Sequence, residues 1–120
     1  MRLKVFPTVE ASRQVRREVS DLASEVDEGS LSDIKTVLTE LITMSVLHGA
    51  SSPIEVCLEL DDGKLEAALR DDGPGARALS RARRRRDDSL VLRIVDGLVE
   101  EWGADDRERR IWFRMKVQRV

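Results

Sequence analysis

The amino-acid sequence predicts an α+β fold: a two-layer sandwich with helices on one face of a mainly antiparallel, mixed sheet. Two amphipathic helical stretches follow a first short strand, a β-hairpin occupies the middle of the chain, and one further helix precedes the last strands. Helices that alternated one-for-one with parallel strands would leave a different pattern. Hairpins combined with helices favour a sheet that helices cover on one face.

The composition indicates a single domain over residues 1–120. A chain of this length can bury one core, and 41% hydrophobic with 37% charged residues is a globular balance. A net charge of −2 argues against a general binder of nucleic acid or membrane surfaces. One cysteine, Cys57, excludes an intrachain disulfide, and one histidine beside it argues against a structural zinc site. No 18-residue apolar run and no signal-peptide core occur, so we expect a soluble cytoplasmic protein without a membrane partner.

The N-terminal segment predicts a strand and then a helix. Residues 2–6 alternate between charged and apolar side chains, which is typical of a short strand. We expect a helix over residues 9–24, capped at its start by Thr8. Its apolar stripe would include Val9 and Ala23.

The stretch that follows predicts the central helix of the fold. Its broad apolar face comprises Leu31, Ile34, Val37, Leu38, Leu41, Ile42, Ser45 and Val46. Ser30 or Ser32 can cap the start, and Gly49 can close the end in a left-handed conformation. Glu40 interrupts the apolar run with a carboxylate that is costly to bury without a partner, and Met44 lies one turn later on the same side.

The middle of the chain predicts a hairpin and then a charged segment. Residues 54–60 and 65–70 alternate with period two on either side of 61-DDG-63, a strong turn signal. These two strands should pair antiparallel with one apolar face toward the helices. Residues 76–88 are highly charged and predict a mobile loop or a short helix.

The C-terminal part predicts a third helix and the last strands. We expect the helix over residues 89–101, capped by Asp88 or Ser89. Its inward side chains would be Leu90, Val91, Ile94, Val95 and Leu98. In the last strand Ile111, Phe113, Met115 and Val117 should face the core. Trp112 should face outward, where it is a candidate protein contact.

Three motifs resemble those of one protein family. The segment 39-TELITMSVLHG-49 is similar to an N box of the form TELxTNAxxHG, and 71-DDGPG-75 is similar to an intact first glycine box. The segment 92-LRIVDGLVEEWG-103, followed by 111-IWFRM-115, resembles the closing part of the same domain. The chain thus resembles the GHKL ATPase domains of the Bergerat fold, and among them the small anti-sigma-factor serine kinases of the RsbW type. This resemblance implies a sigma factor or an anti-anti-sigma (STAS) protein as partner, and a homodimer.

The resemblance also implies roles for particular residues. Glu40 matches the general base that activates the attacking hydroxyl or water. Asp71 matches the carboxylate that accepts a hydrogen bond from the adenine amino group of ATP or ADP. Gly73 and Gly75 match glycines that let the backbone approach the nucleotide. Met44 stands where the family has the asparagine that coordinates magnesium.

Two departures from the family pattern argue against magnesium-dependent catalysis. The Met44 thioether is a soft ligand, whereas magnesium requires hard oxygen. The second glycine box, whose backbone N–H groups hold phosphates at a helix N-terminus, is replaced by 89-SLV-91. We therefore expect a degenerate regulatory domain that acts by protein–protein binding, with impaired or absent use of ATP and magnesium. The alternative is an active ATP-binding protein-serine kinase with Glu40 as general base.

Simpler accounts of the same residues stay open at this point. Glu40 can be a partly exposed helix carboxylate paired with a nearby cation, and 71-DDGPG-75 can be a plain turn. His48 suits a helix C-terminus, and Met44 can simply fill the core. The run 81-RARRRR-86 can be a solvated loop, a lid that grips phosphates or a nucleic-acid patch. The solvated loop is favoured, because no aromatic residues are interleaved for base stacking.

Overall fold

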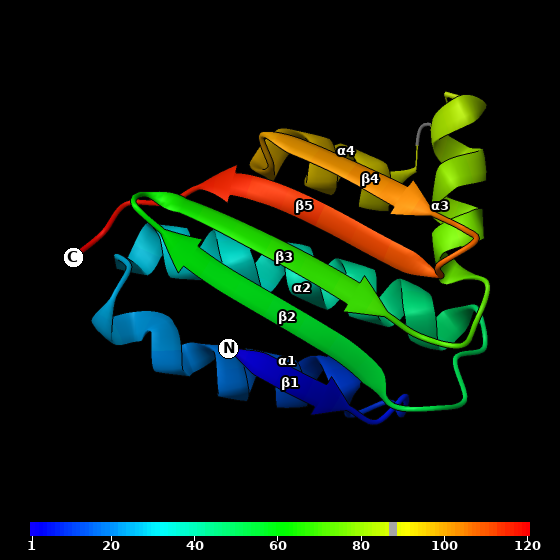
Figure 1. The fold of residues 1–120 in the computed structure, drawn as a ribbon, viewed down its shortest axis with the longest axis horizontal. Helices are drawn as coiled ribbons and strands as arrows, with labels where there is room; N and C mark the ends of the chain where they lie inside the picture. Colours follow the sequence, from blue (N-terminus) through cyan, green and yellow to red (C-terminus); the bar gives the residue numbers. More distant parts are fainter. Residues whose placement is uncertain (87–88) are drawn as a thin grey trace.

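The computed structural model describes residues 1–86 and 89–120, and it shows a layer of helices behind a five-stranded sheet (Figure 1). In chain order the elements are β1 (Arg2–Val5), α1 (Ala11–Val19), the 3₁₀ helix η1 (Ser20–Ser24), α2 (Glu28–Leu47), β2 (Ile54–Asp61), β3 (Lys64–Arg70), α3 (Gly75–Arg84), α4 (Leu90–Leu98), β4 (Glu101–Asp105) and β5 (Arg110–Lys116). The spatial order of the strands is β1-β2-β3-β5-β4. The expected two-layer α+β sandwich is confirmed. Every strand pairing in the described residues is antiparallel, so the expected mixed character of the sheet is wrong.

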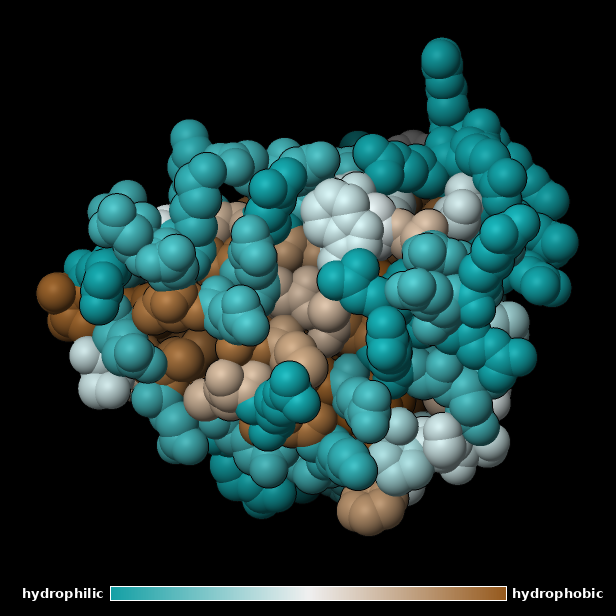
Figure 2. Space-filling view, in the orientation of Figure 1, coloured by the Kyte–Doolittle hydropathy of each residue, from teal (hydrophilic) through white to brown (hydrophobic). Residues whose placement is uncertain are grey.

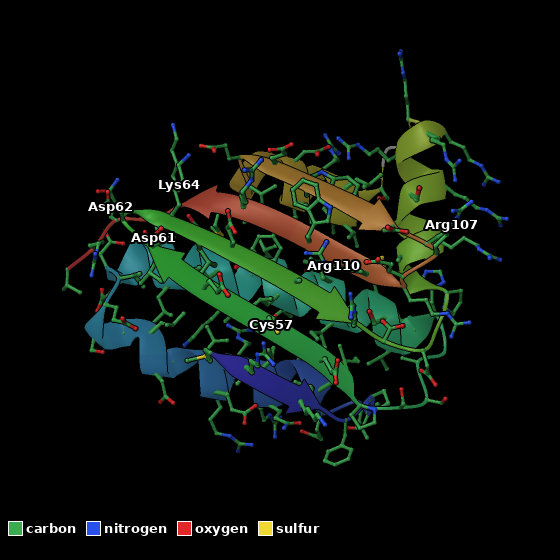
Figure 3. All side chains as sticks on the ribbon, in the orientation of Figure 1. Cys57, Asp61, Asp62, Lys64, Arg107 and Arg110 are labelled. Atoms are coloured by element: carbon green, nitrogen blue, oxygen red, sulfur yellow. The ribbon has the colours of Figure 1, made fainter. Side chains whose placement is uncertain are left out.

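The central hairpin forms as predicted. Leu58 of β2 lies opposite Ala67 of β3, which in turn lies opposite Phe113 of β5. At the turn, Asp62 and Gly63 have φ values of 44° and 81°, the left-handed backbone that a tight two-residue hairpin turn requires. Figure 3 shows this turn at the far end of the sheet from α3.

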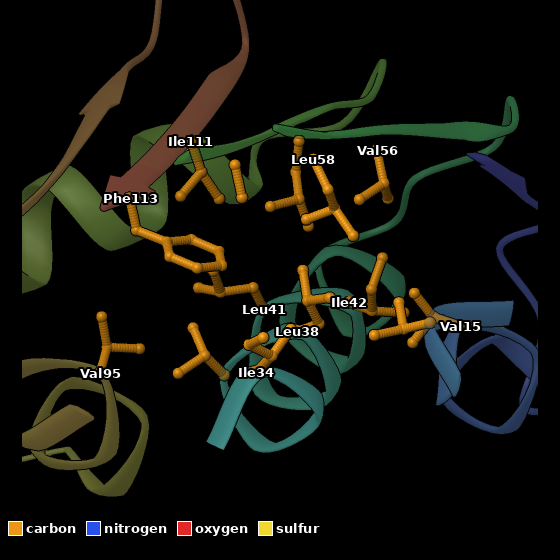
Figure 4. Close-up of a cluster of buried hydrophobic side chains, with 14 of the residues drawn as sticks. Val15, Ile34, Leu38, Leu41, Ile42, Val56, Leu58, Val95, Ile111 and Phe113 are labelled. Carbon is orange, nitrogen blue, oxygen red and sulfur yellow. The ribbon is translucent and has the colours of Figure 1, made fainter. Parts of the chain in front are cut away.

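The core lies between the sheet and the helices (Figure 4). Helix α2 crosses the middle of the sheet, with α1 on one side and α4 on the other (Figure 1). The buried side chains of the core include Ile34, Leu38, Leu41 and Ile42 from α2, Val15 from α1, Val95 from α4, and Val56, Leu58, Ile111 and Phe113 from the sheet. The inward alternation predicted for the last strand is confirmed. None of the described helices is long and apolar enough to cross a membrane.

Helix α2 begins two residues before the first cap that the sequence indicated. The Oδ1 atom of Asp27 accepts a hydrogen bond of 2.8 Å from the backbone N–H of Ser30, so the prediction of Ser30 or Ser32 as cap is wrong. The Ser30 hydroxyl instead accepts a 2.7 Å hydrogen bond from the backbone N–H of Gln118, which ties α2 to the C-terminal segment. At the other end Gly49 has a φ of 91°, as predicted.

The first helix is shorter than predicted. Val9 precedes α1 and is 92% exposed, and Ala23 is also exposed, so both fall outside the buried stripe. The α-helical part stops before Ser20, whose hydroxyl donates a 2.9 Å hydrogen bond to the backbone carbonyl of Arg16. Such a bond competes with regular helix geometry, and a 3₁₀ turn follows.

The charged segment after the hairpin is largely helical. Helix α3 covers most of residues 76–88, so the short-helix alternative is confirmed. The solvated loop favoured for residues 81–86 is wrong for residues 81–84, which are helical. Ala76 and Leu79, three residues apart, are buried on one side of α3, which gives this arginine-rich sequence an apolar face to dock.

Helix α4 is also shorter than predicted and ends at residue 98. Ser89 caps it as predicted, because its Oγ accepts a 3.2 Å hydrogen bond from the backbone N–H of Leu92. The alternative cap, Asp88, lies outside the described residues. Leu90 is 69% exposed, so its predicted inward position is wrong. In this short helix Leu92 and Val95 are the buried residues.

The opposite face of the sheet carries no helix among the described residues (Figure 1). In Figure 2, polar and charged side chains surround an apolar area in the middle of this face. Trp112 lies on this face, half-buried, directly over Gly103 of the neighbouring strand. A Cβ atom on Gly103 would lie 2.7 Å from the indole ring, so a larger residue there would require the ring to move. The role of Trp112 as a protein contact stays a prediction.

Candidate functional site

The end of α2, the turn at residues 71–75 and the start of α3 meet at one end of the sheet. A Cβ atom built on Gly75 would lie 3.4 Å from the Ser45 hydroxyl oxygen and 3.7 Å from the Oδ2 atom of Asp71. One built on Gly73 would lie 2.9 Å from the backbone nitrogen of Ala50, closer than real contacts allow. The structure therefore brings the predicted glycines and Asp71 together with α2. Both glycines permit a close approach of the turn to the protein's own backbone and side chains.

Ser45 is a polar residue of this region that sequence reasoning placed in the apolar face. Its side chain is fully buried, and within residues 1–86 and 89–120 its hydroxyl has no hydrogen-bond partner. An unpaired buried hydroxyl costs about 1–3 kcal/mol. The available signal was that Ser45 is the one hydroxyl among the eight residues of that face.

Asp71 presents its carboxylate to the same place. Its Oδ1 atom accepts a 2.7 Å hydrogen bond from the backbone N–H of Gly73, which fixes the side-chain orientation. Its Oδ2 atom faces the start of α3, where Ser45 also lies. The pair offers one oriented carboxylate acceptor and one hydroxyl that can donate or accept. This combination suits the hydrogen-bonding edge of a planar ligand.

Asp72 has a structural role that the sequence did not predict, because it binds the segment between α2 and β2. Its carboxylate accepts hydrogen bonds from the Ser51 hydroxyl and from the backbone N–H groups of Ser51, at 2.8 Å, and Ser52, at 3.1 Å. These bonds, the Ser51 hydroxyl first, hold the pKa of the Asp72 carboxyl well below its ordinary value of 3.8. Arg109 also donates a 2.6 Å hydrogen bond to the Asp72 carbonyl. The link between α2 and β2 is thereby fastened to the turn.

Glu40 lies on α2 five residues before Ser45, about 7.5 Å along the helix axis. Its side chain is half-buried. In the part of the chain that the structure describes, its carboxylate has no hydrogen-bond or ion-pair partner. Lys35, on the same helix, instead donates a 2.7 Å hydrogen bond to the Ser20 hydroxyl.

Met44 belongs to the hydrophobic core, as the simpler account predicted. Its side chain is 8% exposed, and the next residue on α2 is the buried Ser45. The thioether supplies no oxygen, so this position does not fit a magnesium ligand.

Helix α3 is held over this region by an aromatic anchor. The Arg83 guanidinium lies 4.3 Å from the centre of a Trp102 ring and donates a 2.8 Å hydrogen bond to the Trp102 carbonyl. The Trp102 indole N–H in turn donates a 2.6 Å hydrogen bond to Asp96 of α4. One tryptophan of β4 therefore connects α3 with α4. Figure 1 shows α3 standing upright at this end of the sheet.

Comparisons with known proteins found two similarities. A family model described as the histidine kinase-like ATPase domain matches residues 6–115. The anti-sigma F factor of Shouchella clausii (strain KSM-K16) is 35% identical over 57 residues, which cover 44% of this chain and 39% of that protein. The similarity thus spans less than half the length of this curated relative.

Proposed function

The chain belongs to the histidine kinase-like ATPase domain family, and from that premise we propose that it is a degenerate ATPase-like regulatory domain that acts by binding other proteins. Its relative is an anti-sigma F factor, so the partner class we propose is a sigma factor or an anti-anti-sigma (STAS) protein. Because the match covers 39% of that relative, the partner rests on analogy and on the experiments below.

One observation carries the proposal: the place of the family's magnesium ligand is taken by a methionine that is part of the core. Met44 is 8% exposed and offers sulfur where magnesium needs oxygen. Phosphoryl transfer depends on positioning and on neutralising the phosphate charges, and magnesium does much of both. The domain therefore lacks the means to align a triphosphate for transfer.

The adenine half of the nucleotide site is better preserved. Asp71 would accept a hydrogen bond from the adenine amino group. The Ser45 hydroxyl, which has no hydrogen-bond partner among the described residues, would bond to the same edge of the base, directly or through water. ATP or ADP then serves as a regulatory ligand, held by its base, and its phosphates do not react. The first turn of α3 lies against Ser45, so nucleotide entry requires this turn to move.

A serine kinase with Glu40 as general base is the second candidate. It is favoured by the half-buried Glu40 carboxylate, which has no hydrogen-bond or ion-pair partner in residues 1–86 and 89–120 and so is available to accept a proton. Glu40 and Met44 lie one turn apart on α2, so a metal held near residue 44 would also be near this base.

The test is nucleotide titration by calorimetry and thermal shift, with and without magnesium. A nucleotide at 100 times its dissociation constant stabilises the fold by about 2.7 kcal/mol, a readily measured rise in melting temperature. We expect ATP and ADP to bind with the same affinity whether or not magnesium is present. Met44→Asn should make ATP binding magnesium-dependent, whereas the matched Met44→Leu variant should not.

Phosphate transfer decides between the two candidates. The unaltered protein is incubated with labelled ATP, magnesium and a STAS protein, and label on serine is measured. The regulatory domain predicts a stable complex without label. Transfer that depends on magnesium and disappears in Glu40→Gln would refute the proposal and establish the kinase.

A further inference from the structure

A positively charged groove lies between α3 and the C-terminal end of α2. It has a volume of about 330 Å³ and is lined by His48, Pro74, Arg77, Ala78, Arg81, Ala82 and Arg85. We call it the α3 groove. None of the described residues that line it is acidic. It is distinct from the buried contact between Ser45 and Gly75, because neither residue contributes to its lining.

The arginines of the α3 groove form a regular row. Arg77, Arg81 and Arg85 are four residues apart, so successive guanidinium groups lie on one side of the helix, with about 6 Å of axial rise between them. Two small apolar side chains, Ala78 and Ala82, alternate with these arginines along the helix and also line the groove. In Figure 3, nitrogen-tipped side chains project from α3 away from the rest of the molecule.

Two of these cations have no partner in the described chain. Arg77 forms an ion pair of 3.5 Å with Asp106, and Arg83, outside the groove, is engaged by Trp102. The side chains of Arg81 and Arg85 make no hydrogen bond or ion pair within residues 1–86 and 89–120. Among the described residues, a protein with a net charge of −2 thus presents two guanidinium groups without an ion-pair partner in a groove that Ala78 and Ala82 also line.

We propose that the α3 groove binds an acidic helix of a partner protein, whose carboxylates on successive turns pair with Arg81 and Arg85. Residues four apart on the partner helix match the spacing of the arginines, and its small side chains would pack on Ala78 and Ala82. This inference rests on the proposed function, since the partner is the protein that the regulatory domain binds.

A protein helix fits the groove better than nucleic acid does. The lining contains no aromatic side chain on which a base can stack. The row from Arg77 to Arg85 rises only about 12 Å, enough for two turns of a helix. Beyond the groove the acidic balance of the chain disfavours a long phosphate backbone.

The test uses a synthetic alanine-based helical peptide with glutamate at every fourth position, and a matched peptide with glutamine at those positions. Binding to the full chain is measured by calorimetry at low and at moderate salt. The glutamate peptide should bind, and more weakly as salt rises. Arg81→Gln with Arg85→Gln removes two exposed charge pairs and should weaken its binding by about twofold to thirtyfold. The glutamine peptide cannot form those pairs and should bind to the unaltered protein more weakly by a similar factor.

The control variant is Arg16→Gln with Arg17→Gln on α1. These arginines are exposed, and the change in net charge is the same, so binding should be unaltered. Circular dichroism confirms that both double variants are folded. No binding of the glutamate peptide, or an equal loss in the control variant, would overturn the proposal. Tighter binding of a 16-nucleotide single strand, lost with Arg81 and Arg85, would overturn it in favour of a nucleic-acid surface.

The two proposals fail separately in these experiments. If phosphate transfer depended on magnesium, the regulatory assignment would fail. If in the same protein the glutamate peptide bound and the Arg81 and Arg85 variant lost that binding, the α3 groove would remain a docking site. Absence of transfer together with no peptide binding would remove the groove and leave the regulatory assignment standing.

Discussion

Replacing Gly73 with alanine tests the close contact between the 71–75 turn and the end of α2. The new Cβ atom would lie 2.9 Å from the backbone nitrogen and 3.1 Å from the Cα of Ala50, and 3.3 Å from Oδ1 of Asp71. Backbone atoms cannot rotate away as a side chain can, so the turn or the link from α2 to β2 must shift. Forcing an extra methyl group into a packed site costs about 1–3 kcal/mol.

The matched control is Gly97→Ala in α4. A Cβ atom there meets no other atom within 4 Å, apart from those of its own helix and chain neighbours, and the position is exposed. Alanine is a better helix former than glycine by about 0.5–1 kcal/mol, so this variant should be neutral or stabilised. The two variants make the same chemical change, and only the surroundings differ.

Urea unfolding followed by tryptophan fluorescence measures both variants. We expect Gly73→Ala to lower the free energy of unfolding by about 2 kcal/mol and Gly97→Ala to raise it slightly, without a change in the denaturant slope. If Gly73→Ala were as stable as the unaltered protein, the tight packing of the turn on Ala50 would be refuted. If both variants lost the same free energy, glycine flexibility and not the collision would be the cause.

Three further predictions concern the same region. Ser45→Ala should stabilise the ligand-free protein by roughly 1 kcal/mol, because it removes a buried hydroxyl that has no hydrogen-bond partner in the part of the chain that the structure describes. It should also reduce any melting-temperature shift caused by ATP, and a destabilised variant would mean that the hydroxyl has a partner. Arg83→Ala should cost about 1 kcal/mol and speed hydrogen exchange in α3 relative to α1, because the stacking on Trp102 is lost; unchanged exchange would contradict the anchor. Asp72→Asn should lower the melting temperature at neutral pH. Because the pKa of the Asp72 carboxyl is depressed in the folded protein, its stabilisation of the fold is present above the ordinary pKa of 3.8 and declines as the pH falls below it. A melting-temperature difference that stayed constant from pH 7 to pH 3 would contradict the role of the Ser51 hydrogen bonds.

The local signals in the chain were sufficient for the sheet. Alternation in the segments that became β2, β3 and β5 predicted which side chains face the core, and 61-DDG-63 predicted the turn between the first two. These patterns succeed because side-chain direction in a strand depends only on neighbouring residues, and because few residues tolerate the backbone of a tight turn. The motifs around Glu40 and Asp71 indicated the family for the same reason, since they are contiguous in sequence.

The start of α2 and the state of α3 required the tertiary structure. Asp27, Ser30 and Ser32 are all residue types that cap helices well. Asp27 is the cap in the structure, and the Ser30 hydroxyl accepts a hydrogen bond from the backbone N–H of Gln118, 88 residues away in the chain. The local sequence of the arginine-rich residues 76–86 does not predict that this segment packs on the rest of the domain. It packs there because Ala76 and Leu79 are buried and Arg83 stacks on Trp102.

By itself, then, the sequence determined the order of the strands, the position of the central helix, the inward faces of the strands and the family to which the chain belongs. Three features of the described residues were decided only by the tertiary structure. Ser45 is buried near Asp71 without a hydrogen-bond partner among these residues, and Asp72 fastens the link between α2 and β2 to the turn. Within the same described ranges, Arg81 and Arg85 line one groove without an ion-pair partner. The physical reason is that hydrogen-bond satisfaction and charge pairing depend on which distant groups come within about 3–4 Å, and no local pattern encodes that.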